Sequence, residues 1–282
     1  MLNSYSFKDP YFFFWNQKDQ TITIITDNDR RVHQFEDMNY QNAFLLSSDN
    51  ILCRSDNKID FYDQYFSLYC SKTFSGIRKI KPCSFSDSIF YILKNNHISE
   101  CYLKFDQNTM ESTLIKYKLE IPDDNLSDIR DFAVSKKYFI ILTKTNILVY
   151  LKEDSSQKLK IDLLSHNAKS KLFCDELNFY LYIQNSQIVY MYSFGSSKVI
   201  KIFEKVKNVY SSESVIIHLD KKISINGTLI NNENINDHML FIGIDQGQLF
   251  YFQEDENETD NPKPTFYPQI LFPNFKFQFD DF

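Results

Sequence analysis

The chain has 282 residues, 43% of them hydrophobic and 16% aromatic, which is enough to bury a large core in one repeat domain or two ordinary ones. Its net charge of −6 disfavours a nucleic-acid binder, because affinity for phosphate depends on lysine and arginine. With 5 glycines and 7 prolines, neither a glycine-rich phosphate loop nor a disordered Pro/Gly chain is expected as the main feature.

The N-terminus and the cysteines indicate the compartment. The first residues, MLNSYSFKDPYFFFWNQKD, lack a cationic start followed by an apolar core, so we expect no secretory signal. No stretch reaches the ~18–20 consecutive apolar residues that span a bilayer, so no membrane span is expected. The 5 cysteines are odd in number and widely spaced, which favours free, buried thiols in a cytoplasmic or nuclear protein over a disulfide framework.

A strand–turn–strand pattern recurs along the chain. It is clear in YFIILTKTNILVYL, residues 138–151, where two apolar runs flank a short polar break. Apolar, β-branched and aromatic runs joined by two to four turn-forming residues are the signature of a β-hairpin. In chain order, the predicted turns lie near residues 19, 49, 95, 145, 185, 221 and 245.

The alternation of side chains supports strands over helices. In residues 21–26, Ile22 and Ile24 share one face while Thr21 and Thr23 take the other. In residues 187–194 both faces are apolar or aromatic, which suits a strand packed between two neighbouring sheets. The best helical candidate, residues 153–172, is better interpreted as a strand at 159–164 followed by a polar loop.

The spacing of the turns indicates a larger repeat. Successive gaps are 30, 46, 50, 40, 36 and 24 residues, and the middle ones fall near the length of a propeller blade. We expect the short first and last gaps to place two hairpins in one blade or to mark atypical terminal blades. A further short strand precedes three of the hairpins, in IRKIKPCSF, IRDFAVS and VKNVYSS.

Over residues 10–253 this pattern resembles β-propeller repeats, either WD40-like or RCC1-like. IGIDQGQLFYF, residues 242–252, is similar to a WD40 inner hairpin, and residues 206–227 are similar to an RCC1 repeat. Trp15 is followed by Asn16, so the WD40 Trp-Asp pair is missing, and most RCC1 glycines are missing too. The resemblance implies an all-β fold, a β-propeller of six or seven four-stranded blades that need not be regular. It leaves the subfamily open and carries over no functional residue.

No chemical motif stands out. The histidines show no HxxxH or HExxH spacing, and GxSxG, GxGxxG and GxxxxGKS do not occur. We therefore predict no catalytic, cofactor-binding or metal-binding residues, no cofactor, and no enzyme activity. His218 is interpreted as a core or strand-edge residue, and Phe12–Trp15 as a buried first strand rather than a ligand-stacking cluster. The acidic pairs at 123–124 and 280–281 are expected in loops or tails.

The C-terminal end is the most distinctive segment. We predict a propeller over residues 1–253, an acidic, proline-containing linker over 254–264, and an aromatic-rich segment over 265–282. Either FKFQF, residues 275–279, closes the propeller as a last strand, which we favour, or the segment docks on another protein. The candidate partner-binding residues are Phe266, Phe272, Phe275, Phe277 and Phe279.

Three hypotheses for function follow. The leading one is a non-catalytic scaffold for protein–protein interaction, a subunit of a larger cytoplasmic or nuclear assembly whose partners are its other proteins. The alternative, implied by the RCC1 resemblance, is a nucleotide exchange factor for a small GTPase, which would act by wedging into the nucleotide site. A propeller hydrolase or lyase is disfavoured, because no ring of His, Asp and Arg is visible in the sequence. Fold alone does not choose among them.

Overall fold

The computed structural model describes residues 4–8, 11–26, 29–47, 50–83, 86, 88–94, 97–106, 111–119, 128–163, 169–211, 214–231, 235, 239–245, 248–253 and 269–270. By its internal contacts the chain divides into two compact units. Unit 1 comprises Met1–Ile129 and Lys152–Ser156, and unit 2 comprises Arg130–Leu151 and Gln157–Phe282. Within the described residues all regular elements are β-strands, and none forms an α-helix that could cross a membrane.

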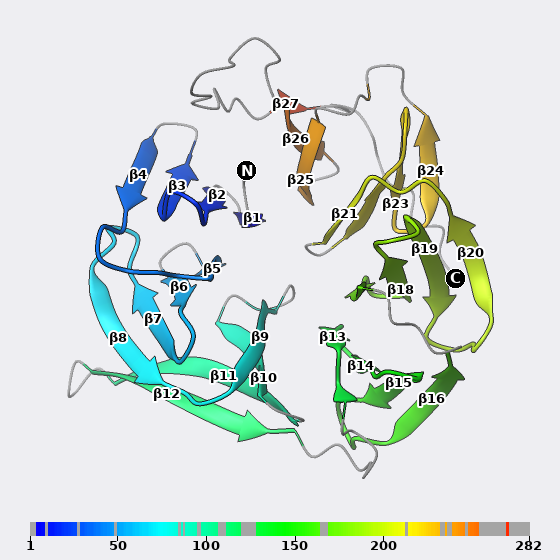
Figure 1. The fold of residues 1–282 in the computed structure, drawn as a ribbon, viewed down its shortest axis with the longest axis horizontal. Coiled ribbons are helices and arrows are strands. Elements are labelled where there is room, and N and C mark those ends of the chain that lie inside the picture. The colour runs from blue at the N-terminus through cyan, green and yellow to red at the C-terminus, as the bar shows by residue number, and fades with distance from the viewer. Residues whose placement is uncertain are drawn as a thin grey trace. The chain divides into compact units, whose positions relative to one another are not determined.

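Unit 1 contains three four-stranded antiparallel sheets, each with its strands side by side in chain order (Figure 1). The first sheet consists of β1 Ser4–Lys8, β2 Tyr11–Asn16, β3 Thr21–Ile25 and β4 Arg30–Gln34. The second consists of β5 Asn42–Ser47, β6 Asn50–Arg54, β7 Lys58–Tyr62 and β8 Leu68–Thr73. The third consists of β9 Ile77–Pro82, β10 Ile89–Lys94, β11 His97–Asp106 and β12 Glu111–Lys118.

Unit 2 repeats this plan. Its first sheet consists of β13 Asp131–Val134, β14 Tyr138–Leu142, β15 Asn146–Leu151 and β16 Gln157–Asp162. Its second sheet consists of β17 Ser170–Cys174, β18 Asn178–Ile183, β19 Ile188–Ser193 and β20 Val199–Phe203. Its third sheet consists of β21 Asn208–Ser211, β22 Val215–His218, β23 Lys222–Ile225 and β24 Thr228–Asn231. A three-stranded sheet follows, made of β25 Met239–Asp245, β26 Gln248–Gln253 and β27 Gln269–Ile270.

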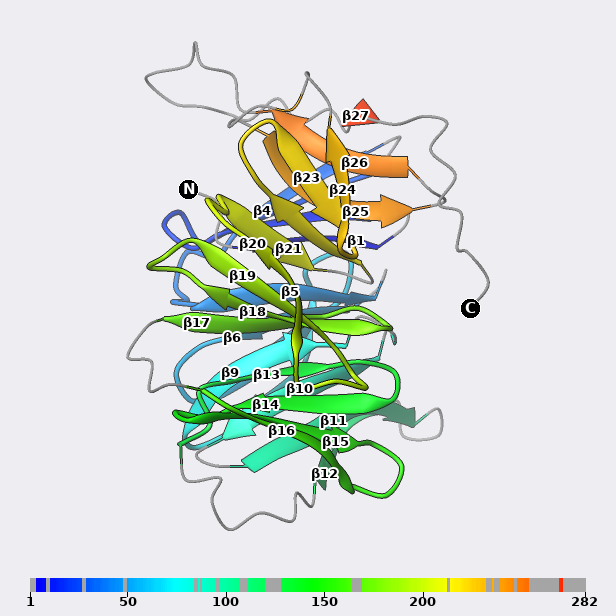
Figure 2. The same cartoon turned by 90° about the vertical axis from the view of Figure 1, so that its right-hand side faces the viewer.

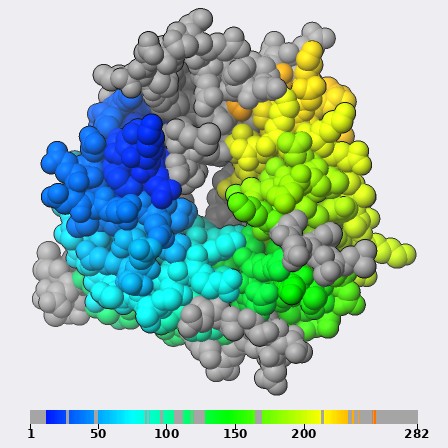
Figure 3. Space-filling view, viewed as in Figure 1, coloured from blue at the N-terminus to red at the C-terminus, as the bar shows by residue number. Residues whose placement is uncertain are grey.

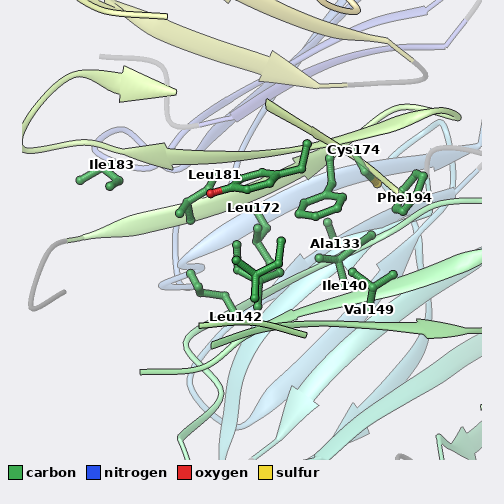
Figure 4. Packing of buried hydrophobic residues seen from close by; sticks show 13 residues of the cluster. Ala133, Ile140, Leu142, Val149, Leu172, Cys174, Leu181, Ile183 and Phe194 are labelled. Carbon is green, nitrogen blue, oxygen red and sulfur yellow. The ribbon is translucent and has the colours of Figure 1, made fainter. Parts of the chain in front are cut away.

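The cores lie between consecutive sheets. In unit 2, the β13–β16 sheet packs on the β17–β20 sheet through residues such as Ile140, Val149 and Leu181, which Figure 4 shows converging. A second cluster joins Tyr182 and Val189 of β18 and β19 to the next sheet. Two corresponding clusters join the three sheets of unit 1. Sheets buried on both faces need apolar side chains at successive strand positions, and β14 has this pattern.

Six four-stranded antiparallel sheets, packed on one another in chain order within each unit, define a β-propeller. The predicted all-β propeller class is therefore confirmed. The 138–151 hairpin is also confirmed: β14 and β15 pair from Tyr138↔Leu151 to Leu142↔Ile147. The three short strands predicted upstream of hairpins are β9, β13 and β21, the first strands of their sheets.

Of the two alternatives expected for the short gaps, the first, two hairpins in one blade, is wrong. The seven hairpins lie in seven different sheets, so no sheet contains two of them. The gaps vary because the turn near residue 49 joins the first and second strands of its sheet, whereas the turn near residue 19 joins the second and third. The last hairpin, β25–β26, belongs to the three-stranded sheet, so the expectation of an atypical terminal blade holds there.

Candidate interaction surface

The loop between β7 and β8 carries two aromatic side chains where polar turn residues are usual. Residues 63–67 read Asp-Gln-Tyr-Phe-Ser, and the Tyr65 side chain is 72% exposed. Exposed aromatic and apolar side chains that form a contiguous patch can mark an interaction site. We call residues 63–67 together with Arg31 and His33 of β4 the β7–β8 loop surface.

The backbone of this loop is held by Asp63. Its Oδ1 accepts hydrogen bonds from the Tyr65 and Ser67 amides, both at 2.8 Å, which closes an Asx-type turn. The Phe66 amide donates to the Asp63 carbonyl at 3.0 Å, and the Asp63 amide donates to the Ser67 carbonyl at 3.1 Å. The loop therefore has a defined conformation.

Phe66 adopts a strained backbone conformation. Its φ is +65°, in the left-handed region that bulky residues rarely enter. Such strain costs on the order of 1–3 kcal/mol and persists only where surrounding contacts over-determine it. Here the Phe66 ring stacks on the His33 ring of the neighbouring sheet, with centroids 4.6 Å apart and planes 10° apart. His33 also meets the buried Phe35 edge-on at 4.6 Å.

Arg31 joins the same loop from β4. Its Nη1 donates to the Gln64 carbonyl at 2.8 Å, and its guanidinium carbon lies 5.7 Å from the centre of the Tyr65 ring. Its Nε pairs with Asp29 at 2.8 Å, which holds the guanidinium in place. The result is an exposed tyrosine above a fixed arginine, a combination that binding hot spots favour.

The β7–β8 loop surface combines a neutral imidazole with exposed aliphatic side chains. Partial burial lowers the pKa of His33 below its ordinary value, so the stacked imidazole is favoured in its neutral form near pH 7. Leu68, directly after the loop, is 48% exposed, and Val32, between Arg31 and His33, is 56% exposed. The surface can therefore offer an aromatic and apolar contact with a cation beneath it.

Among the described residues, the thiols are buried and metal-ligating side chains do not cluster. No group of three or more His, Cys, Asp or Glu that could hold a metal ion occurs among them. All 5 cysteines are free thiols and buried, as predicted. Burial raises the pKa of Cys101 to about 12 and that of Cys53 well above its ordinary value, which suppresses the reactive thiolate.

A polar cluster in unit 1 surrounds the buried carboxylate of Asp60. Asp60 is 0% exposed and accepts a hydrogen bond from the Tyr40 hydroxyl at 2.6 Å, while Lys58 pairs with the same oxygen at 3.0 Å. The Tyr40 hydroxyl also lies 2.6 Å from that of Tyr62. Asp60 Oδ1 is buried and has no hydrogen-bond partner, which is uncommon for a buried polar atom. The cluster ties the β4–β5 connection to β7, and we assign it a structural role.

The residues singled out from the sequence have different outcomes. Phe266, Phe272, Phe275, Phe277 and Phe279 lie outside the described residues, as do His166, His238 and both acidic pairs. His218 is 2% exposed in β22, and Phe12–Trp15 is buried in β2, so both core interpretations are confirmed. His33 contributes to the β7–β8 loop surface as a stacking ring.

Sequence reasoning missed Tyr65 and Phe66. A signal was present, because aromatic residues stand between Asp63 and Ser67, two turn formers that close a hairpin. The contact with Arg31 and His33 spans 33 residues of sequence, so only the stacking of the two sheets reveals it.

The fold places this chain among the β-propellers, and comparison with solved structures agrees. Kluyveromyces lactis Hsv2 has a TM-score of 0.53 at 10% identity, covering 95% of this chain and 97% of that one. BamB from Moraxella catarrhalis has a TM-score of 0.56 at 10% identity, covering 90% and 82%. The β-propeller domain of Myceliophteria thermophila Cps50 (Swd1) has a TM-score of 0.56 at 11% identity, covering 89% and 93%. No protein-family model and no curated protein sequence matches the chain.

Proposed function

We propose that the chain is a non-catalytic protein-interaction scaffold, a subunit of a larger intracellular assembly, and that the β7–β8 loop surface contacts a partner protein. The observation that carries this proposal is Tyr65, 72% exposed on a loop whose backbone and neighbours are held in place. A rigid tyrosine loses little conformational entropy on binding, so its contact area contributes to affinity with a small ordering cost.

The non-catalytic part of the proposal has separate support. The thiols are buried, and the most prominent buried carboxylate, Asp60, is enclosed with Tyr40 and Lys58. General acid–base and nucleophilic groups must reach a substrate, and burial separates these groups from solvent. The alternative, an RCC1-like exchange factor, remains a prediction from the resemblance. It is tested by measuring nucleotide release from small GTPases loaded with a fluorescent nucleotide.

Replacing Tyr65 by alanine is expected to weaken partner binding about 30-fold, the effect of a hot spot worth roughly 2 kcal/mol. The full chain is purified with its bound proteins from its native cell, and the affinity for the recovered partner is then measured with purified components. Tyr117→Ala is the matched control, since Tyr117 is a 55% exposed tyrosine on another sheet of unit 1. We expect this control to keep the wild-type affinity.

The outcome that would overturn this assignment is equal loss or equal retention of the partner by both variants. Thermal melts of the two variants should match the wild type, because both side chains project mainly into solvent. If Tyr65→Ala alone lowered the melting temperature, the loop would have a structural role and the binding result would not support a contact.

The C-terminal segment is proposed as a second partner contact, and two truncations separate its roles. β27 pairs with β26 through Phe250↔Ile270 and Tyr251↔Gln269, so ending the chain at residue 253 removes a strand of the last sheet. We expect that truncation to lower the melting temperature by about 5 °C or more.

Ending the chain at residue 270 keeps β27 and removes Phe272, Phe275, Phe277 and Phe279. If the segment docks on a partner, this truncation should melt within about 2 °C of the full chain and lose partner protein in pull-downs. If residues 275–279 close the propeller, which we favour, its melting temperature should fall. A drop in melting temperature as large as that of the 253 truncation would instead assign these phenylalanines to the fold.

A further inference from the structure

A basic residue recurs at the start of the first strand of several sheets. The segments IRKIKPCSF, IRDFAVS and VKNVYSS each begin with an apolar residue followed by a basic one, namely Arg78, Arg130 and Lys207. β17 also has a lysine, Lys171, as its second residue. Arg130, Lys171 and Lys207 belong to unit 2, so three consecutive sheets of this unit carry a cation where their first strand starts.

Hydrogen bonds confirm that these starts share one end of the sheets with the turns between second and third strands. Antiparallel pairing in chain order places the two at the same end. The Arg130 amide donates to the Leu142 carbonyl, at the end of β14, at 2.7 Å, and the Val206 amide donates to the Gln187 carbonyl, just before β19, at 2.8 Å. In Figure 2 the strands of these sheets run mostly across the view, and Figure 3 is seen along them, with unit 2 coloured from green to yellow.

A buried carboxylate joins two of the basic residues across neighbouring sheets. Asp131 is 1% exposed, and its Oδ2 accepts a hydrogen bond from the Leu172 amide at 2.8 Å. Arg130 precedes Asp131 and Lys171 precedes Leu172, so this bond holds the two basic residues on adjacent strands. Their backbone positions are therefore fixed relative to each other.

This end of the β13–β16 and β17–β20 sheets has an excess of positive charge. We call its basic residues the cationic face: Arg130, Lys144, Lys169, Lys171, Lys205 and Lys207. The five lysines are exposed and Arg130 is half-buried. Lys207 pairs with Asp220 at 3.2 Å, and Lys221 and Lys222 follow in the same turn of the next sheet. The acidic residues at this end, among those described in the two sheets and their connections, are Asp162, Glu204 and the buried Asp131.

The opposite end of the same two sheets shows no such excess. Its turns in unit 2 carry Lys136, Lys137 and Lys198 together with Asp175 and Glu176, and Lys136 pairs with Glu176. The whole chain has a net charge of −6, so the cationic face also departs from the overall composition. A local patch of one sign in a chain of the other sign favours association with an oppositely charged partner.

We propose that the cationic face binds an acidic segment of a partner protein, rich in Asp and Glu. None of the large exposed apolar side chains lies among the described residues of these connections, so recognition here depends on charge. The absence of exposed aromatic rings in that part of the chain disfavours single-stranded nucleic acid, whose bases stack on such rings. The proposal concerns unit 2 and is independent of the β7–β8 loop surface in unit 1.

Fluorescence anisotropy tests this with the full chain and a labelled peptide of about twelve residues in which glutamate alternates with serine. At about 50 mM NaCl we expect a dissociation constant on the order of tens of micromolar. Lys169→Glu combined with Lys171→Glu should weaken binding at least about tenfold, because two exposed cations become anions. The matched control, Lys137→Glu combined with Lys198→Glu, makes the same charge change at the opposite end and should bind within about twofold of the wild type.

Salt and a nucleic-acid probe complete the experiment. Raising NaCl from about 50 to about 300 mM should weaken peptide binding at least about fivefold by screening. A single-stranded oligothymidylate of the same charge as the peptide should bind less tightly than the peptide. Circular dichroism melts check folding, and if the charge-reversed variant melts early, Lys169→Gln combined with Lys171→Gln should still weaken binding at least about threefold.

Three results would each overturn the proposal: a wild-type chain that does not bind the peptide, equal affinity in the two double variants, or tighter binding of the oligothymidylate. The last result would assign the cationic face to nucleic acid. The peptide is measured without the partner used to test Tyr65, so failure here is distinguishable from failure of the β7–β8 loop surface.

Discussion

Replacing Phe179 by alanine is expected to destabilise unit 2 by about 3–5 kcal/mol, the cost of removing a fully buried aromatic side chain from a packed core. Phe179 of β18 is 0% exposed and lies in the cluster between the two first sheets of the unit. Its ring stacks on Tyr192, with centroids 5.1 Å apart, and lies 5.6 Å from Phe194. The alanine side chain leaves a cavity that these rings cannot fill, since each is held by its own strand.

Urea unfolding followed by circular dichroism measures this loss. The matched control is Leu177→Ala, two residues away in the β17–β18 turn and 72% exposed, which should change the free energy of unfolding by less than about 0.5 kcal/mol. A Phe179→Ala variant that lost less than about 1.5 kcal/mol would mean that the sheets do not pack as described.

The second large effect is a loss of stability at alkaline pH. Three buried tyrosines donate hydrogen bonds to carboxylates, Tyr40 to Asp60 at 2.6 Å, Tyr91 to Glu100 at 3.0 Å and Tyr180 to Asp175 at 2.6 Å. Burial above all, and then the neighbouring negative charges, raises the pKa of all three hydroxyls far above 10.0, the ordinary value for tyrosine.

The direction in which the free energy of unfolding changes with pH depends on whether the folded or the unfolded state ionises first. Below about pH 10 these tyrosines are neutral in both the folded and the unfolded chain, so their contribution to stability is fully present. As the pH rises further, the unfolded chain loses the three protons while the folded chain keeps them, and the free energy of unfolding falls. Each tyrosine contributes about 1.4 kcal/mol per pH unit, or about 4 kcal/mol per unit for the three.

Urea unfolding at several pH values between about 8 and 11.5 gives this slope, and absorbance at 295 nm reports how many tyrosines ionise before unfolding. Tyr180→Phe should lower the stability at pH 8 by about 1–3 kcal/mol, because Asp175 loses a buried donor, and should reduce the alkaline slope by about 1.4 kcal/mol per pH unit. A free energy of unfolding that stayed level up to pH 11 would contradict the prediction.

Local pattern was sufficient to predict most strands. In β14 and β15 the apolar runs are short, rich in β-branched residues and joined by Thr143–Asn146, so the hairpin follows from neighbouring residues alone. The same pattern located one hairpin in each of the seven sheets. It could not assign hairpins to sheets, because the first-to-second and second-to-third turns of a sheet look alike in sequence.

The candidate surfaces were less predictable. Tyr65 and Phe66 could be recognised as aromatic residues in a turn, but not the arginine and histidine that hold them. The hydrogen bond from Lys201 Nζ to the Gly227 carbonyl is likewise not evident from the sequence. In both cases the decisive partner lies on a neighbouring sheet.

The sequence by itself determined the all-β class, the repeated hairpins and the burial of the thiols, because these depend on side-chain alternation and turn chemistry over a few residues. The tertiary structure alone decided which strands share a sheet and which loop meets β4. Those features depend on how consecutive sheets stack, and stacking brings together residues such as Arg31 and Gln64, or Lys201 and Gly227, that no local pattern relates.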